Sequence, residues 1–177
     1  MESRPDGGLA DAADTAVDGQ RYVVQTAGQT WMNAWHRPGP APEGRRHGSA
    51  GICLTSSGEV VLVTEDGVRW DLPAGRPEGD ETWEQTLRRE MLEEACAEVG
   101  AARLLGFAQG RCTEGHERGQ VLVRSFWLAD VVLHPWEPQF EIVERKLVPA
   151  RDLLSHMTIE PGYFPIYRRA LLEAGLT

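Results

Sequence analysis

The chain has 177 residues, 41% of them apolar, which suits one globular domain with a single core. Its net charge of −9 disfavours a nucleic acid duplex or an anionic membrane as partner, because both attract basic surfaces. Three cysteines, Cys53, Cys96 and Cys112, lack CxxC spacing and indicate neither disulfides nor zinc. The cysteine usage fits a reducing cytoplasm, where we expect the protein. No apolar run reaches the ~20 residues that span a bilayer, so we expect a soluble protein.

The first 47 residues are predicted to be a tail followed by a short extended region. MESRPDGGLADAADTAVDGQ has acidic residues and no apolar segment, so it is not a secretory signal and reads as disordered. Residues 21–25 look strand-like, and residues 30–36 are a second candidate strand. A proline-rich loop, RPGPAPEGRR, then separates residues 1–47 from a main domain at 48–177.

The main domain is predicted to alternate strands with helices. Runs rich in β-branched and aromatic residues predict strands at 49–55, 60–65, 104–110, 120–132 and 141–149. The polar loop RCTEGHERG, which begins at Arg111, is expected to lie over a cleft. A short helix is predicted at 150–157 and a terminal helix at 165–174, with Gly175 as its stop.

One further helix carries an acidic edge, in the run GRPEGDETWEQTLRREMLEEACA that begins at Gly75. At about 100° per residue, Glu90, Glu93 and Glu94 share an arc of roughly 100°. Leu87 and Met91 begin a neighbouring apolar face that can pack on a sheet. Carboxylates at this spacing repel one another. They therefore predict a bound Mg²⁺ or Mn²⁺, which suits all-oxygen sites and bridges to substrate phosphates.

The full pattern of this run is G-x5-E-x7-R-E-U-x-E-E, in which U is the apolar Met91. That pattern is the Nudix box, so the chain resembles Nudix hydrolases over about residues 48–175. The resemblance implies an α/β fold, the Nudix-type α/β/α sandwich with a mixed sheet. One position departs from the family, because Cys96 stands where glycine usually ends the helix. We therefore expect a helix about one turn longer, stopped by Gly100.

The resemblance assigns roles within the box. Glu90, Glu93 and Glu94 would bind the divalent metal, together with the backbone carbonyl of Ala74. Arg89 would pair with Glu81 or Glu90 and hold the carboxylates in place.

The general base stays open, because family members take it either from the box or from a later loop. Glu93 is the first candidate, followed by Glu141, Glu144 and Glu137. His116 in the polar loop is a candidate acid or phosphate contact.

Substrate contacts are predicted from residue chemistry. Trp83 projects on the acidic side of the box helix and is the leading candidate for stacking on a nucleobase; Trp31, Trp35 and Trp127 are the others. Arg111 and Arg124 are candidates for phosphate binding.

The leading hypothesis is a metal-dependent Nudix pyrophosphohydrolase. Its small nucleotide-like substrate would be a nucleoside triphosphate or a nucleoside diphosphate linked to another moiety, such as a sugar. The alternative is a catalytically inactive Nudix-fold domain that senses nucleotides or regulates a partner. The sequence also allows a homodimer formed through the tryptophan-bearing N-terminal segment.

Overall fold

The computed structural model describes residues 14–176. The elements are β1 (Arg21–Thr26), β2 (Gln29–His36), β3 (Arg45–Leu54), β4 (Glu59–Thr64), β5 (Ala74–Gly75), α1 (Trp83–Ala95), β6 (Ala97–Glu114), β7 (Val121–Leu133), β8 (Glu144–Pro149), α2 (Leu153–His156) and α3 (Phe164–Ala174). The predicted tail covers residues 1–20, and its residues 1–13 lie outside the described residues. In the described part of this segment, Ala16 is 3% exposed and Asp18 forms an ion pair with Arg169 at 2.8 Å, so residues 14–20 pack on the fold. Among residues 14–176, no helix combines the length and apolar character needed to cross a bilayer.

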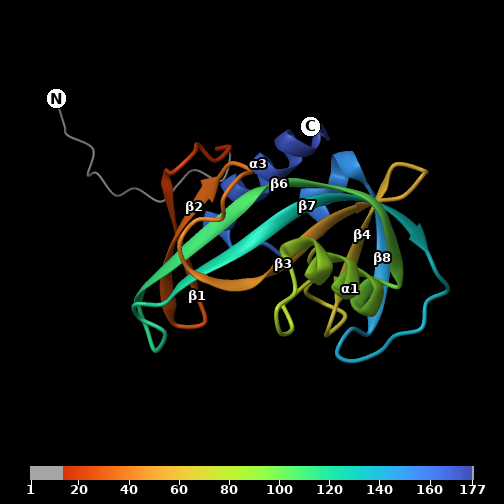
Figure 1. Cartoon of the computed structure of the whole chain (residues 1–177), viewed down its shortest axis with the longest axis horizontal. Helices are drawn as coiled ribbons and strands as arrows, with labels where there is room; N and C mark the ends of the chain where they lie inside the picture. The colour runs from red at the N-terminus through yellow and green to blue at the C-terminus, as the bar shows by residue number, and fades with distance from the viewer. Residues whose placement is uncertain (1–13, 177) are drawn as a thin grey trace.

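The strands form one mixed sheet in the order β1-β2-β6-β7-β3-β4-β8, and β5 pairs with β3 (Figure 1). The β3–β7 pair is parallel, and the other pairs are antiparallel. Side chains alternate between the two faces of a strand. Ile52 and Phe126 therefore join the core cluster that contains α3, whereas Cys53 and Trp127 join the cluster that contains α1. The predicted α/β/α sandwich with a mixed sheet is confirmed.

The strands expected near residues 21–25 and 30–36 are present as β1 and β2, and they extend the same sheet. β2 pairs along its length with β6, and the predicted boundary between residues 47 and 48 falls inside β3. Tyr22 and Trp35 are 1% and 0% exposed. Trp35 therefore packs within the chain, where it offers no surface to a second copy, and the homodimer stays a prediction.

Helix α1 begins with a capping box. The Thr82 hydroxyl accepts a hydrogen bond from the Gln85 backbone N–H, and the Gln85 side chain accepts one from the Thr82 N–H. Leu87 and Met91 on its apolar face are fully buried against the sheet. The helix therefore holds a fixed position against β3, β4 and β6.

The prediction that α1 continues past Cys96 is wrong. The helix ends at Ala95, and Cys96 takes the left-handed conformation (φ 50°, ψ 41°) that the family glycine was expected to supply. Strand β6 starts at the next residue, where Ala97 pairs with Leu133. The Arg145 side chain donates to the carbonyl oxygens of Ala95 (2.8 Å) and Cys96 (3.4 Å), so the helix end is satisfied without another turn.

Candidate active site

Arg89 organises the carboxylates of the box. Its guanidinium donates two hydrogen bonds to Glu81 (both 2.9 Å), one to Glu90 (2.7 Å), one to Glu93 (3.1 Å) and one to the carbonyl of Arg76 (2.7 Å). A guanidinium has five N–H donors, so all of them are engaged. Hydrogen bonds from Arg89 lower the pKa of Glu81 to about 2. The expectation that Arg89 pairs with Glu81 or Glu90 is therefore met by both.

Gly75 leaves space for the Glu90 carboxylate. A β-carbon at this position would lie 1.9 Å from Glu90 Cδ, and the side chain would have to move. The glycine is therefore required by close approach, since its backbone does not need a positive φ.

Glu94 is held by strand β5. Its Oε2 accepts a hydrogen bond of 2.9 Å from the Ala74 N–H. Burial is the main cause that raises the Glu94 pKa to about 7, and the nearby charge of Glu90 adds to it. Burial also raises the pKa of Glu90, although Arg89 opposes this. These carboxylates are costly to ionise in the fold unless a cation compensates them.

Glu90, Glu93 and Glu94 line one cavity of about 630 Å³, which we call the box cleft. Ala74, Arg89 and Glu141 line it too. As the side chains lie, however, no three His, Cys, Asp or Glu groups within residues 14–176 form a metal-ligand cluster. Glu90 and Glu93 are turned toward Arg89 instead. The carboxylates supply the hard oxygen donors that Mg²⁺ or Mn²⁺ prefers, so the donor set fits such an ion.

A second cavity, of about 400 Å³, lies beside the box cleft and is called here the aromatic pocket. Its floor is one face of the sheet, because strand residues two apart point the same way. These floor residues are Trp31, Asn33, Arg45, His47, Ala108, Gly110, Leu122, Arg124 and Phe126. Tyr163 and Tyr167, from the segment that begins α3, line it as well.

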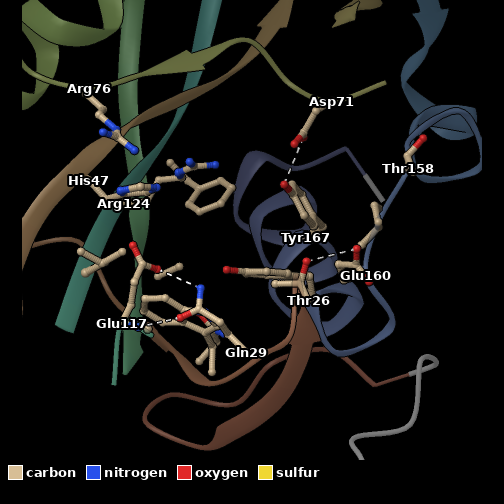
Figure 2. A pocket seen from close by; sticks show the side chains of 18 of the residues that line it. Thr26, Gln29, His47, Asp71, Arg76, Glu117, Arg124, Thr158, Glu160 and Tyr167 are labelled. Atoms are coloured by element: carbon tan, nitrogen blue, oxygen red, sulfur yellow. Dashed lines mark hydrogen bonds between the residues drawn. The ribbon is translucent and has the colours of Figure 1, made fainter. Parts of the chain in front are cut away.

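His47, Arg76 and Arg124 line both cavities, and we call them the basic cluster. Figure 2 shows them together on one side of the aromatic pocket, across from Asp71 and Tyr167. Burial, aided by Arg124 and Arg76, lowers the His47 pKa to about 4, so this imidazole is neutral at pH 7. Within residues 14–176, the guanidiniums of Arg76 and Arg124 form no hydrogen bond or ion pair; the Arg76 backbone alone bonds, to Arg89.

Some of the predicted substrate-binding residues line one of the two cavities, and others do not. Arg124 lines both cavities, and Trp31 lines the aromatic pocket. Trp83 lines neither, because it packs on Phe107 and under the Arg46 guanidinium. Arg111 also lines neither. Trp35 and Trp127 are core residues at 0% and 8% exposure, which argues against stacking.

Among the candidate bases, Glu93 and Glu141 line the box cleft. Glu137 lines a separate neighbouring hollow, and Glu144 lies at the start of β8 outside both cavities. His116 is exposed and lines neither cavity, whereas its neighbour Glu117 lines the aromatic pocket.

Sequence reasoning missed His47, Arg76, Asn33 and Asp71. Arg76 sits inside the box run, so its position next to Gly75 was a usable signal. The others come from strands and loops whose pairing brings them together, and no spacing in the chain marks them.

Comparisons with known proteins agree with this geometry. The NUDIX domain family model matches residues 45–170. The chain therefore belongs to the NUDIX family, as the box pattern predicts. A comparison with curated protein sequences gives no match.

Solved structures share the fold at low sequence identity. A mutant form of the Bacillus subtilis pyrophosphohydrolase BsRppH is 21% identical, with 87% of this chain and 96% of that chain covered and a TM-score of 0.63. A NUDIX hydrolase from Nitrosomonas europaea is 18% identical, with 75% and 89% covered and a TM-score of 0.57. The NUDIX domain of Shewanella oneidensis NrtR, complexed with ADP ribose, is 17% identical, with the same coverage and a TM-score of 0.56.

Proposed function

We propose that this chain is a divalent-metal-dependent hydrolase that cleaves the diphosphate linkage of a nucleotide-like substrate. The observation that carries the proposal is that the two neighbouring cavities share the basic cluster as lining. One cavity holds carboxylates and the other is lined by aromatic rings. Arg76 and Arg124 line both, and their guanidiniums have no partner among residues 14–176. Such an arrangement suits a ligand with an anionic chain at one end and an apolar group at the other.

Glu90, Glu93 and Glu94, with the carbonyl of Ala74, would hold the ion. Nudix hydrolases generally use divalent metals, and Mg²⁺ or Mn²⁺ suits these oxygen donors. When bound, the ion neutralises anhydride charge and polarises the phosphorus–oxygen bonds. Glu90 and Glu93 would exchange part of their Arg89 contacts for it. Arg89 and Glu81 act as positioning residues. Arg89 donates hydrogen bonds to Glu90 and Glu93, and Glu81 accepts two from Arg89 and so fixes the guanidinium.

Glu93 or Glu141 would act as general base and accept the proton of the attacking water, because both line the box cleft. Arg76 and Arg124 would contact the phosphate oxygens and stabilise the charge that develops there. Neutral His47 would donate or accept a hydrogen bond on the same chain of phosphates. The substrate is a nucleoside triphosphate or a nucleoside diphosphate linked to another moiety.

The test is phosphate and pyrophosphate release from nucleoside triphosphates, ADP-ribose, nucleotide sugars and dinucleoside polyphosphates, with Mg²⁺ or Mn²⁺. We expect Glu93→Gln to lower kcat about 100-fold or more on the substrate that wild type turns over. The matched control is Glu84→Gln, on the first turn of α1, where Arg88 is the one ion-pair partner of Glu84 in the described part of the chain. It should stay within about twofold.

Absence of metal-dependent turnover by wild type across this panel would overturn the proposal. Tight nucleotide binding without turnover would then favour the sensing domain. Equal losses in Glu93→Gln and Glu84→Gln would also count against it, because they would show that the box cleft is not the reaction site.

A further inference from the structure

A buried chain of hydrogen bonds crosses from the middle of the sheet to the start of α1. The Trp127 indole N–H donates to Ser125 Oγ, and the Ser125 hydroxyl donates to Ser49 Oγ, each at 2.8 Å. The Ser49 hydroxyl then donates to the backbone carbonyl of Trp83, also at 2.8 Å. Ser49 and Ser125 are 0% exposed, and Trp127 is 8% exposed. We call these three side chains the serine chain, and no step of the proposed hydrolysis uses them.

The two ends of the serine chain fix the direction of every bond in it. An indole N–H can only donate and a carbonyl can only accept, so the Ser49 proton points to Trp83 and the Ser125 proton points to Ser49. Each buried hydroxyl therefore donates once and accepts once. A buried network that is fully satisfied in this way favours one arrangement of the elements that it joins. Here those elements are β7, β3 and α1.

Ser49 also lies where β3 meets β5. It pairs with Gly75 of β5, and its neighbour Ala50 pairs with Ala74. On the other side of Ser49, a β-carbon at Gly48 would lie 2.4 Å from the Gly75 carbonyl oxygen. The two strands therefore approach as closely as glycine permits, and β5 is fixed to this part of β3.

The residues proposed to hold the divalent ion come from β5 and α1. Ala74 belongs to β5, whereas Glu90, Glu93 and Glu94 belong to α1. The apolar face of α1 holds the helix on the sheet, but apolar burial is non-directional and does not fix a register by itself. The hydrogen bond from Ser49 is directional. It ties the first residue of α1 to the strand that also carries β5.

We propose that Ser49 is a positioning residue for the ion site. Its hydroxyl fixes the register of α1 on β3 and so sets the carboxylates of α1 against the carbonyl of Ala74. Ser125 and Trp127 hold the Ser49 hydroxyl in its donating orientation. The inference rests on the proposed function for the identity of the ion ligands.

The test is Mn²⁺ binding without substrate, measured by the loss of the free-ion EPR signal. Ser49→Ala should raise the Mn²⁺ dissociation constant about fivefold, less than the loss of a group that contacts a ligand directly. Ser49→Thr keeps the hydroxyl and adds a methyl group at a fully buried position. It should lower the temperature of unfolding and still bind Mn²⁺ within about twofold of wild type. If Ser49 served stability alone, the threonine variant would bind as weakly as the alanine one.

Trp127→Phe is the control at the far end of the serine chain. It keeps a ring in the core and removes the donor to Ser125, so it should lower the temperature of unfolding. Mn²⁺ affinity should stay within about twofold, because Ser49 still donates to Trp83. A metal-free measurement completes the test. In EDTA, hydrogen exchange of the Thr86 amide in the first turn of α1 should be about tenfold faster in Ser49→Ala than in Trp127→Phe.

Wild-type Mn²⁺ affinity in Ser49→Ala would overturn the inference while leaving metal-dependent hydrolysis intact. Equal losses of affinity in Ser49→Ala and Trp127→Phe would overturn it too. If Ser49→Ala does not fold, Ser49→Cys replaces it, because a thiol is a weaker donor of similar size. That variant should bind Mn²⁺ about threefold more weakly, and wild-type affinity in it would overturn the inference.

The outcome for the proposed function is separate. Weakened Mn²⁺ binding in Ser49→Ala, together with no turnover by wild type across the substrate panel, would uphold the inference and overturn the proposed function. A wild type that binds no Mn²⁺ would overturn both.

Discussion

No other side chain can make all the contacts of Arg89, because its guanidinium donates five hydrogen bonds to four partner residues. A lysine has three donors on one nitrogen and cannot bridge Glu81, Glu90 and Glu93 together. We expect Arg89→Lys to lower kcat/KM at least tenfold and the free energy of unfolding by about 1–3 kcal/mol. Steady-state kinetics and urea unfolding measure the two effects.

The neighbouring Arg88→Lys is the control for that experiment. Arg88 pairs with exposed Glu84 and donates to the carbonyls of Val99 and Gly100, all away from the box cleft. Arg88→Lys should lower the free energy of unfolding and leave kcat/KM within about twofold of wild type. If Arg89→Lys retained wild-type kinetics, Arg89 would not be positioning the carboxylates.

The raised pKa of Glu94 predicts how the stability of the metal-free protein changes with pH. Its folded pKa of about 7 exceeds its ordinary value of 4.5, so the folded state holds the proton more tightly than the unfolded chain. The stability from this group is therefore full below pH 4.5 and is lost as pH rises to about 7. Glu94→Gln keeps an acceptor for the Ala74 N–H and removes the titration.

The measurement is urea unfolding in EDTA at pH 4 and at pH 8. At each pH, the free energy of unfolding of wild type is subtracted from that of Glu94→Gln. This difference should be larger at pH 8 than at pH 4 by on the order of 2 kcal/mol. Adding Mn²⁺ at pH 8 should stabilise wild type more than the variant, because only wild type offers this carboxylate. A gain of the same size at both pH values would mean that Glu94 ionises freely in the fold.

At the scale of elements, the end of α1 tests how a left-handed position tolerates side chains. Cys96 adopts φ 50° there, and a left-handed residue costs roughly 1–2 kcal/mol for most L-amino acids, with β-branched ones the worst. Cys96→Val should therefore destabilise the protein by about 2 kcal/mol, while Cys96→Gly should stay within about 1 kcal/mol because strain relief offsets lost packing. Urea unfolding ranks the variants, and a valine variant as stable as the glycine one would contradict this account.

The same helix shows which elements the sequence could predict. The acidic edge, the arginine and the apolar face of α1 depend only on spacing within one helix, so they could be predicted from the sequence. Its end was mispredicted because Ala97 pairs with Leu133 and Arg145 caps the last carbonyls, both contacts from distant segments. The aromatic pocket was unreadable for the same reason, since Asn33 and Arg124 meet only after β2, β6 and β7 have paired.

At the scale of the whole molecule, β1 and β2 are predicted to be part of the folding unit, contrary to a domain that starts at residue 48. Tyr22, Val24 and Trp35 are at most 1% exposed, and burial of each is worth about 2–3 kcal/mol. Their sum is comparable with the ~5–15 kcal/mol stability of a typical domain.

Deletion of residues 1–42 should therefore abolish cooperative unfolding, because it also exposes the edge of β6 that pairs with β2. Thermal unfolding followed by circular dichroism measures this, and Trp35→Phe serves as a milder comparison that keeps both strands. That variant should unfold cooperatively at a lower temperature, since it loses buried surface without loss of β-sheet pairing. A deleted chain with a sharp transition near the wild-type temperature would restore the boundary at residue 48 and make the N-terminal strands an accessory to a complete domain.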